Sequence, residues 1–197
     1  MLKKILIGFV VILAIFLIVV AFQPADFRIT RSTTIAAPAA DVFAQVNDFH
    51  NWEAWSPWAK LDPAMKKTYE GPPAGADSVY TWTGNDKVGE GRMTIMESHP
   101  NDLIRIKLQF IKPFEATNTA EYTFKQDGNQ TTVTWSMYGV NGFMAKGFNL
   151  VMNMDKMVGG DFEKGLAQMK AVVETPAKVD TPVKSDPPAK PEPPVTK

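Results

Sequence analysis

The segment RSTTIAAPAADVFAQVNDFHNWEAWSPW, residues 31–58, contains three successive patterns that together point to the fold class. Its Thr- and Ile-rich beginning continues a run from residue 27 and predicts a first strand over residues 27–36. Pro38 then stands where a first helical turn tolerates proline, and residues 41–46 have the pattern of a short amphipathic helix. The segment ends with tryptophans at every third position, Trp52, Trp55 and Trp58. Their spacing predicts one or two further helical turns.

Alternation of apolar and polar residues dominates the chain after this segment and predicts a series of strands. In the clearest case, apolar residues occupy every even position from Ile104 to Phe110. Turn signals such as Gly84-Asn85-Asp86 and Asp127-Gly128-Asn129 separate the runs. The predicted strands are residues 66–70, 78–83, 88–98, 103–111, 114–125 and 131–140. Consecutive hairpins of this kind form a curved antiparallel sheet.

The pattern changes to a helical one after Asn141-Gly142. Apolar residues then recur at spacings of three and four from Met144 to Val173. The series predicts one long helix, or two helices joined near residues 153–155. Its apolar stripe must be buried, and the sheet is the surface available for it.

The N-terminal region contains an uncharged stretch, residues 5–22, in which fifteen of eighteen residues are Ile, Leu, Val or Phe. As a helix of about 27 Å, it approaches the roughly 30 Å of a bilayer hydrocarbon core and predicts a transmembrane anchor. Lys3 and Lys4 place residues 1–4 in the cytoplasm and the following domain outside it, in the periplasm of a Gram-negative source. Arg28 and Arg31, just beyond the span, act against this orientation. The competing interpretation is a signal peptide cleaved after Ala21.

Composition excludes several classes of function. The chain has no cysteine, so a disulfide framework, thiolate catalysis and Cys-ligated metal are excluded. Its 21 basic and 21 acidic residues balance, which gives no sign of nucleic-acid binding. The two histidines, His50 and His99, lack ligand spacing, so neither a metal site nor a cofactor is predicted. No G-x-S-x-G, H-E-x-x-H or P-loop motif is present.

The C-terminal tail, residues 175–197, has seven prolines, four lysines, three acidic residues and no aromatic residue. Such a segment buries too little apolar surface to offset the entropy of ordering, so disorder or polyproline structure is expected. The tail either keeps the protein soluble or reaches a partner in the cell envelope.

The order of the predicted elements resembles that of the helix-grip superfamily, also called SRPBCC or START-like, and its polyketide cyclase/dehydrase-like members. Residues 31–58 resemble its opening strand, its I-x-A-P-x-x-x-V-F helix start and its W-x-x-W-S-P segment. GEGRMTIMES (residues 89–98) is similar to its central strand, and DFEKGLAQMK (residues 161–170) to the end of its last helix. The resemblance covers roughly residues 27–174.

This resemblance implies an α+β helix-grip fold, in which a curved antiparallel sheet wraps around the long C-terminal helix. A cavity between sheet and helix is then the natural ligand site. The motifs are structural ones, and members of the superfamily include ligand carriers, cyclases and hydrolase-like proteins, so the fold does not select a reaction.

Aromatic residues and methionines supply the candidates for lining such a cavity. They are Tyr69, Tyr80, Trp82, Tyr122 and Trp135 on predicted strands, and Met152 and Met157 in the C-terminal helical region. Ordinary core packing accounts for each of them equally well. Met152, Met154 and Met157 alternatively form a membrane-facing or gating patch. The three tryptophans of the opening segment either wall the cavity or pin the short helices to the core.

Asp155 is the one weak candidate for catalysis, because it interrupts the apolar series of the last helix. In a continuous helix its carboxyl group would point into the cavity, where burial raises a carboxyl pKa and produces a general acid. The competing interpretation is that Asp155 is the N-cap of a second helix.

Three functions remain in view. The leading hypothesis is a membrane-anchored binding module that encloses a hydrophobic or lipid-like small molecule. The first alternative is a cyclase- or dehydrase-type enzyme using Asp155, Tyr80 or Tyr122, and the sequence does not decide whether the protein is an enzyme. The second is a non-catalytic envelope protein that binds a partner.

Overall fold

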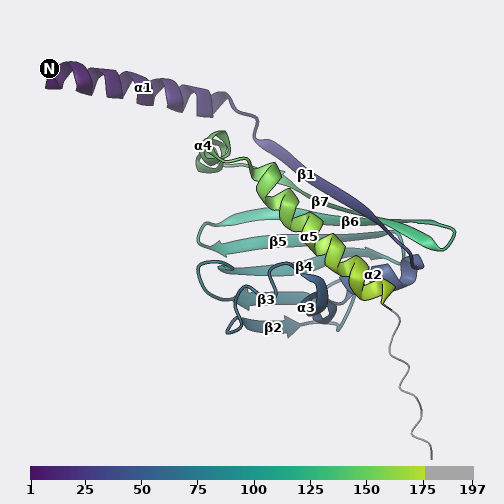
Figure 1. The fold of residues 1–197 in the computed structure, drawn as a ribbon. Coiled ribbons are helices and arrows are strands. Elements are labelled where there is room, and N and C mark those ends of the chain that lie inside the picture. The colour runs from purple at the N-terminus through teal and green to yellow at the C-terminus, as the bar shows by residue number, and fades with distance from the viewer. Residues whose placement is uncertain (176–197) are drawn as a thin grey trace, which may run out of the picture.

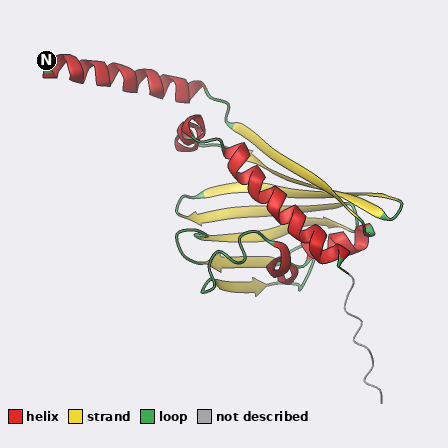
Figure 2. Cartoon of the chain, viewed as in Figure 1, coloured by secondary structure: helices red, strands yellow, loops and turns green. Residues whose placement is uncertain are grey.

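The computed structural model describes residues 1–175, in which a long helix lies across one face of an antiparallel sheet (Figures 1 and 2). The sheet has seven strands in the order β1-β7-β6-β5-β4-β3-β2. The elements are α1 (Leu2–Phe22), β1 (Asp26–Ile35), α2 (Ala39–Asn47), η1 (Phe49–Asn51), α3 (Trp52–Trp55), β2 (Lys66–Glu70), β3 (Val79–Thr83), β4 (Glu90–His99), β5 (Leu103–Lys112), β6 (Ala116–Asp127), β7 (Gln130–Val140), α4 (Phe143–Val151) and α5 (Met154–Glu174). The predicted α+β order of strand, short helices, strands and C-terminal helix is confirmed.

The predictions made for the tail, residues 175–197, fall outside the described residues except at Thr175. Disorder, a solubilising role and an envelope partner for this segment therefore stay predictions.

Antiparallel pairing brings distant parts of the chain to one end of the sheet. Asp26, at the start of β1, pairs with Val140 at the end of β7. The pairing of the remaining strands places the β5–β6 turn (residues 113–115) and the β3–β4 turn (residues 84–89) at this same end. Residues 23–25 connect this end of the sheet to α1. We call it the α1 end of the sheet.

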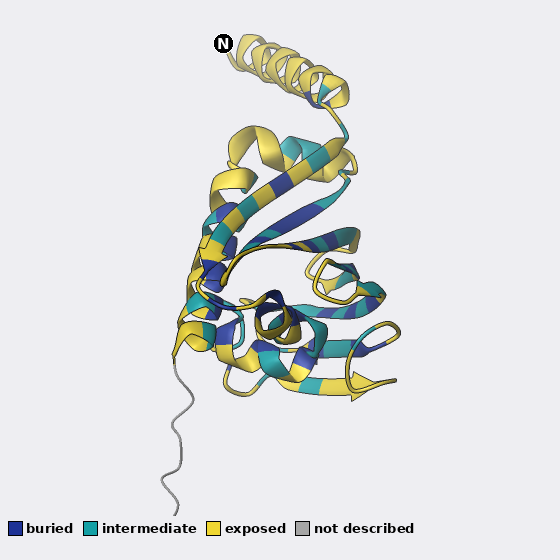
Figure 3. Cartoon of the chain, turned by 90° about the vertical axis from the view of Figure 1, so that its right-hand side faces the viewer, coloured by how far each residue is buried: buried dark blue, intermediate teal, exposed yellow. Residues whose placement is uncertain are grey.

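Helix α5 covers the sheet with one side, and Figure 3 shows that buried side in dark blue. Phe162, Leu166 and Met169 are buried there, and the Phe162 ring stacks on Trp135 with centroids 4.0 Å apart. Burying an apolar side chain of this size contributes about 1.5–3 kcal/mol. Gly165 allows the close approach, because a Cβ atom at this position would lie 3.0 Å from Trp135 and 3.1 Å from Pro57.

The C-terminal helical region is two helices, which settles the alternative left open by the sequence. The chain leaves helical geometry at Met152 and Asn153, and the Asn153 side chain accepts a hydrogen bond from the Lys156 backbone N–H at 2.8 Å. This bond satisfies one of the free N–H groups at the start of α5. The N-cap is therefore Asn153, and the prediction that Asp155 caps the helix is wrong by two positions.

Helix α1 projects away from the sheet, and Figure 3 shows it exposed along nearly its whole length. Val20 is its only buried residue. Among the described residues, α1 is the one helix long and apolar enough to cross a membrane, a test that a signal sequence near the N-terminus also passes.

Candidate functional site

A cavity of about 340 Å³ lies between the sheet, the first turns of α5 and the α3 region. This volume falls within the range of roughly 300–1,000 Å³ that is typical of small-molecule pockets. The sheet contributes Tyr69, Tyr80, Trp82, Met93, Leu108, Phe110, Lys112, Ala120, Tyr122, Trp135 and Met137. The wall is therefore mainly apolar and aromatic, and it suits an apolar ligand.

Strand alternation produces this wall. On β6, Ala120 and Tyr122 are buried while the Thr123 side chain between Tyr122 and Phe124 is exposed, because successive side chains point to opposite faces. Tyr122 pairs directly with Trp135 on β7, and their rings stack with centroids 5.0 Å apart. The cavity floor is thus fixed by the β6–β7 register.

The three tryptophans after α2 divide between the two roles considered for them. Trp55 is fully buried outside the lining, and its indole N–H donates to the Gln45 carbonyl at 3.0 Å, so it pins α3 to α2. Trp52 and Trp58 line the cavity. The Trp52 indole N–H also donates to a backbone carbonyl, that of Val46, at 3.1 Å.

Two buried donors on the cavity floor lack a partner among the described residues. They are the hydroxyl group of Tyr122 and the indole Nε1–H of Trp135. By contrast, the Trp82 indole N–H on the same wall donates to the Val88 carbonyl at 3.0 Å. A buried donor without a partner costs about 1–3 kcal/mol. Both residues line the cavity, but less than 1 Å² of each donor atom is accessible, so a ligand acceptor reaches these donors only when the side chains around them move.

The tyrosines of the cavity are held in the neutral form. Burial raises the pKa of Tyr122 well above its ordinary value. Desolvation is also the main cause of the raised pKa of Tyr80 and of Tyr69. A neutral phenol donates a hydrogen bond and does not act as a base at neutral pH, so these residues can polarise an acceptor on a ligand.

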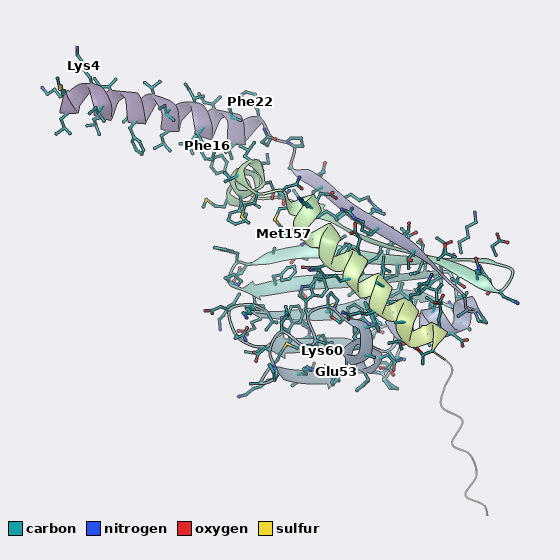
Figure 4. All side chains as sticks on the ribbon, viewed as in Figure 1. Lys4, Phe16, Phe22, Glu53, Lys60 and Met157 are labelled. Atoms are coloured by element: carbon teal, nitrogen blue, oxygen red, sulfur yellow. The ribbon has the colours of Figure 1, made fainter. Side chains whose placement is uncertain are left out.

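Five of the seven cavity candidates from the sequence line the cavity, namely Tyr69, Tyr80, Trp82, Tyr122 and Trp135. Met152 and Met157 do not. Met152 lies in the break between α4 and α5, and Met157 is 46% exposed on the α4 side of α5 (Figure 4). The lining residues of α5 are Val158, Asp161 and Phe162. The two methionines do not line the cavity, because neither belongs to the apolar stripe of α5, which reaches the cavity through Val158 and Phe162.

Asp155 also lies away from the cavity. Arg31 of β1 donates to its carboxylate at 3.0 and 3.2 Å and to Glu163 at 2.7 Å, so the three residues join β1 to α5. The hydrogen bond from Arg31 lowers the pKa of Asp155. The expectation of a buried general acid with a raised pKa is therefore wrong, because the carboxylate is exposed and paired with a cation.

Several lining residues were absent from the sequence-based candidates. Leu108 and Phe110 on β5, and Val158 and Phe162 on α5, belong to the apolar series that predicted a strand and a helix. The pattern showed that these side chains face inward. It could not show which inward-facing side chains border empty space.

Five charged residues line the cavity, and two of them are the lysines Lys87 and Lys112. Glu53, Asp86 and Asp161 line it, and Glu53 pairs with Lys67 while Asp161 pairs with Lys164. Within residues 1–175, no group of three or more His, Asp or Glu side chains is arranged to hold a metal ion.

The sequence profile of the family described as "Polyketide cyclase / dehydrase and lipid transport" matches residues 26–174. The chain belongs to this family. The match confirms the resemblance seen in the opening segment, and it covers the sheet and α5 together with everything between them. A comparison with curated protein sequences gives no match.

Solved structures share the fold of this member of the polyketide cyclase/dehydrase and lipid transport family. Protein SA2116 from Staphylococcus aureus, described as of unknown function, is 10% identical with a TM-score of 0.59, over 78% of this chain and 96% of that one. Ms6760 from Mycobacterium smegmatis is 20% identical with a TM-score of 0.52, over 74% and 90%. The di-domain ARO/CYC BexL from the BE-7585A biosynthetic pathway is 18% identical with a TM-score of 0.55, over 79% and 52%. At these identities the likeness shows the fold alone.

Proposed function

We propose that this family member binds an apolar, lipid-like small molecule that carries a hydrogen-bond acceptor, and that α1 anchors the domain in a membrane. The observation that carries the proposal is the floor of the cavity, where an apolar wall contains two donors without protein partners, on Tyr122 and Trp135. A carbonyl oxygen of a ketone, ester or quinone could accept from either donor once the side chains around it move. An alkane would leave both unpaired.

The test uses the full chain in nanodiscs, with intrinsic tryptophan fluorescence as readout, since Trp52, Trp58, Trp82 and Trp135 line the cavity. The probes are a medium-chain methyl ketone and the alkane of equal length. Satisfying the donors recovers about 1–3 kcal/mol, so the ketone should bind at least ~5-fold more tightly. Equal affinities for the two probes would contradict the proposal that the ligand carries a hydrogen-bond acceptor.

A matched pair of variants tests the cavity itself. Ala120 lines it, so Ala120→Phe should fill the space and abolish binding of both probes. Ala167 is exposed on α5 outside the lining, so Ala167→Phe adds the same group without closing the cavity. Unspecific partition of the probes into nanodisc lipid is equal in both variants. Binding that survives Ala120→Phe would contradict a ligand site in the cavity.

The anchor is supported by the length and apolarity of α1 and by its exposure. Lys3 and Lys4 favour a cytoplasmic N-terminus and an extracytoplasmic domain. The N-terminal sequence of the mature chain and its extraction with alkaline carbonate test this. An intact N-terminus in the membrane pellet supports an anchor, and a chain that begins after Ala21 in the soluble fraction contradicts it.

A cyclase- or dehydrase-type activity is the second candidate, and it rests on Asp161, an acidic residue of α5 that lines the same cavity as Tyr69, Tyr80 and Tyr122. Incubation with a poly-β-ketone substrate, followed by mass spectrometry, tests it. For an enzyme of this type, Asp161→Asn should stop product formation while binding of the substrate persists. Absence of product from the unaltered protein favours the binding module.

A further inference from the structure

Helix α4 is an apolar helix that the domain does not bury. No residue of α4 falls in the core of the described structure. Met144 is 84% exposed, Val151 78% and Phe148 54%. Monomeric soluble proteins rarely leave several large apolar side chains exposed side by side on one element, so this helix requires another environment.

The exposed apolar residues of α4 share one side. At about 100° per residue, Phe143, Met144, Gly147, Phe148, Leu150 and Val151 fall within an arc of roughly 160°. Ala145, Lys146 and Asn149 occupy the remainder. The helix is therefore amphipathic, with a single cation on its polar side, which is the pattern of helices that lie in a membrane interface.

The apolar side of α4 meets α1. A Cβ atom at Gly147, near the middle of that side, would lie 3.6 Å from Val20 and 4.0 Å from Phe16. This contact buries Val20, which is 1% exposed. Figure 4 shows Phe16 on the side of α1 that faces α4, and Figure 1 shows α4 nearly end-on where α1 lies in the plane of view. Helix α4 thus crosses α1 instead of running along it.

The contact fixes the depth of α4 along the anchor. From Phe16 to the end of α1 at Phe22 is six residues, or roughly 9 Å of helix. Interfacial helices bury their apolar side about 5–10 Å into the boundary between headgroups and acyl chains. A helix that crosses a membrane span at this height therefore lies in the interface.

We propose that α4 is an interfacial helix, lying along the surface of the bilayer that α1 spans, with Met144, Phe148 and Val151 among the upper acyl chains. This proposal rests on the anchoring role of α1 proposed above. The partner is the lipid bilayer, because the apolar side of α4 is continuous with the membrane-spanning surface of α1. Lys146, on the polar side, reaches the headgroups.

Docking of α4 on the bilayer would also orient the cavity relative to the membrane. The β3–β4 and β5–β6 turns lie at the α1 end of the sheet, and they contribute Lys87, Val88 and Pro113 to the lining. In the same turn as Pro113, Phe114 is 78% exposed. When α4 contacts lipid, the β3–β4 and β5–β6 turns that line the cavity therefore face the bilayer.

The chain has no cysteine, so single cysteines can carry an environment-sensitive fluorophore without background labelling. Met144→Cys probes the apolar side of α4, and Asn149→Cys is the matched control on the polar side of the same helix. Ile12→Cys, in the middle of α1, reports on the anchor. The full-length variants are reconstituted in phosphatidylcholine nanodiscs, with spin-labelled lipids and aqueous iodide as quenchers.

At Met144→Cys we expect a blue shift of emission, quenching by a lipid spin-labelled near the headgroup, and loss of iodide quenching. Asn149→Cys should keep its iodide quenching, and Ile12→Cys should be quenched by a lipid labelled deep in the chain. If Met144→Cys shows water-like emission while Ile12→Cys is quenched by the deep label, the interfacial position of α4 is overturned and the anchoring role of α1 is kept. Water-like emission at both positions overturns the anchor as well. A blue shift at Met144→Cys that disappears on dilution to one chain per nanodisc assigns the apolar side to a second copy of the chain and overturns lipid docking.

Discussion

Replacing Tyr122 with phenylalanine is expected to stabilise the ligand-free protein, although Tyr122 is fully buried at the centre of the core. Its hydroxyl group donates to no group among the described residues. Folding therefore removes this hydroxyl from water without giving it a partner. The substitution removes the desolvated group and leaves the aromatic contacts with Trp55 and Trp135 in place.

The magnitude follows from two opposing contributions. An unsatisfied buried hydroxyl costs about 1–3 kcal/mol. Removing one oxygen atom enlarges the cavity by an estimated ~10 Å³, which costs about 0.2 kcal/mol at roughly 24 cal/mol per Å³. The net expectation is a gain of about 1–3 kcal/mol in the free energy of unfolding. For a chain of this size, that is a rise in Tm of roughly 2–12 °C.

The assay is urea unfolding of the full chain in detergent micelles, followed by circular dichroism, after native mass spectrometry has confirmed that no molecule remains bound. Tyr138→Phe is the control, because the Tyr138 hydroxyl donates to Glu121 at 3.3 Å. Losing that hydrogen bond should lower stability by about 0.5–1.5 kcal/mol. The same atom is thus deleted from two tyrosines on the same strand pair, with opposite expected signs.

A Tyr122→Phe variant that is destabilised as much as Tyr138→Phe would refute this reasoning, since the Tyr122 hydroxyl would then have a partner in the ligand-free state. Adding the methyl ketone probe provides a second check. The ketone should raise the stability of the unaltered protein by more than it raises the stability of the Tyr122→Phe variant. The difference in stability between the two proteins should therefore become smaller.

Two further predictions concern α5. Gly165→Ala should lower the free energy of unfolding by up to about 2 kcal/mol, because overpacking against Trp135 and Pro57 costs about 1–3 kcal/mol and the better helix propensity of alanine returns up to about 1. Gly160→Ala, where a Cβ atom meets nothing within 4 Å, should raise it by up to about 1 kcal/mol. Urea titrations compare the two, and equal effects would contradict the packing explanation. The second prediction uses the lowered pKa of Asp155 beside Arg31. A lowered folded-state pKa contributes stability that is present above the ordinary aspartate pKa of about 3.9 and is lost as pH falls through the folded-state value. In the Arg31→Gln variant, the urea midpoint should therefore fall less steeply as the pH drops below about pH 4. An unchanged dependence of the midpoint on acid pH would show that the Arg31–Asp155 pair contributes nothing to stability.

The elements of this fold could be predicted from the sequence because local patterns determine them. The alternation from Ile104 to Phe110 reflects one buried face of β5, and Pro38 followed by Val42 and Phe43 marks the start of α2. Such signals lie within a few residues of each other. Pairing order then follows from short hairpin turns, which leave consecutive strands few alternatives.

The site was predicted less completely, because its properties depend on contacts between distant residues. Asp155 pairs with Arg31, which is 124 positions away, and no local sequence pattern predicts that partner. Met152 and Met157 were chosen for the adaptability of methionine and lie outside the apolar series, and the structure leaves both partly exposed. Whether the donors of Tyr122 and Trp135 have partners is likewise a property of the assembled core.

The three residues between Phe22 and Asp26 limit how far the domain can move from α1. At about 3.3–3.6 Å per residue, they reach roughly 10 Å when fully extended, less than the thickness of the domain itself. Where α1 spans a bilayer, the domain cannot diffuse away to search the surrounding water. A molecule dissolved in the adjacent leaflet then crosses little water to reach the cavity, so its supply depends on lateral diffusion and on how strongly it partitions into lipid. Under these conditions, a compound with negligible aqueous solubility is as available to the protein as a soluble one.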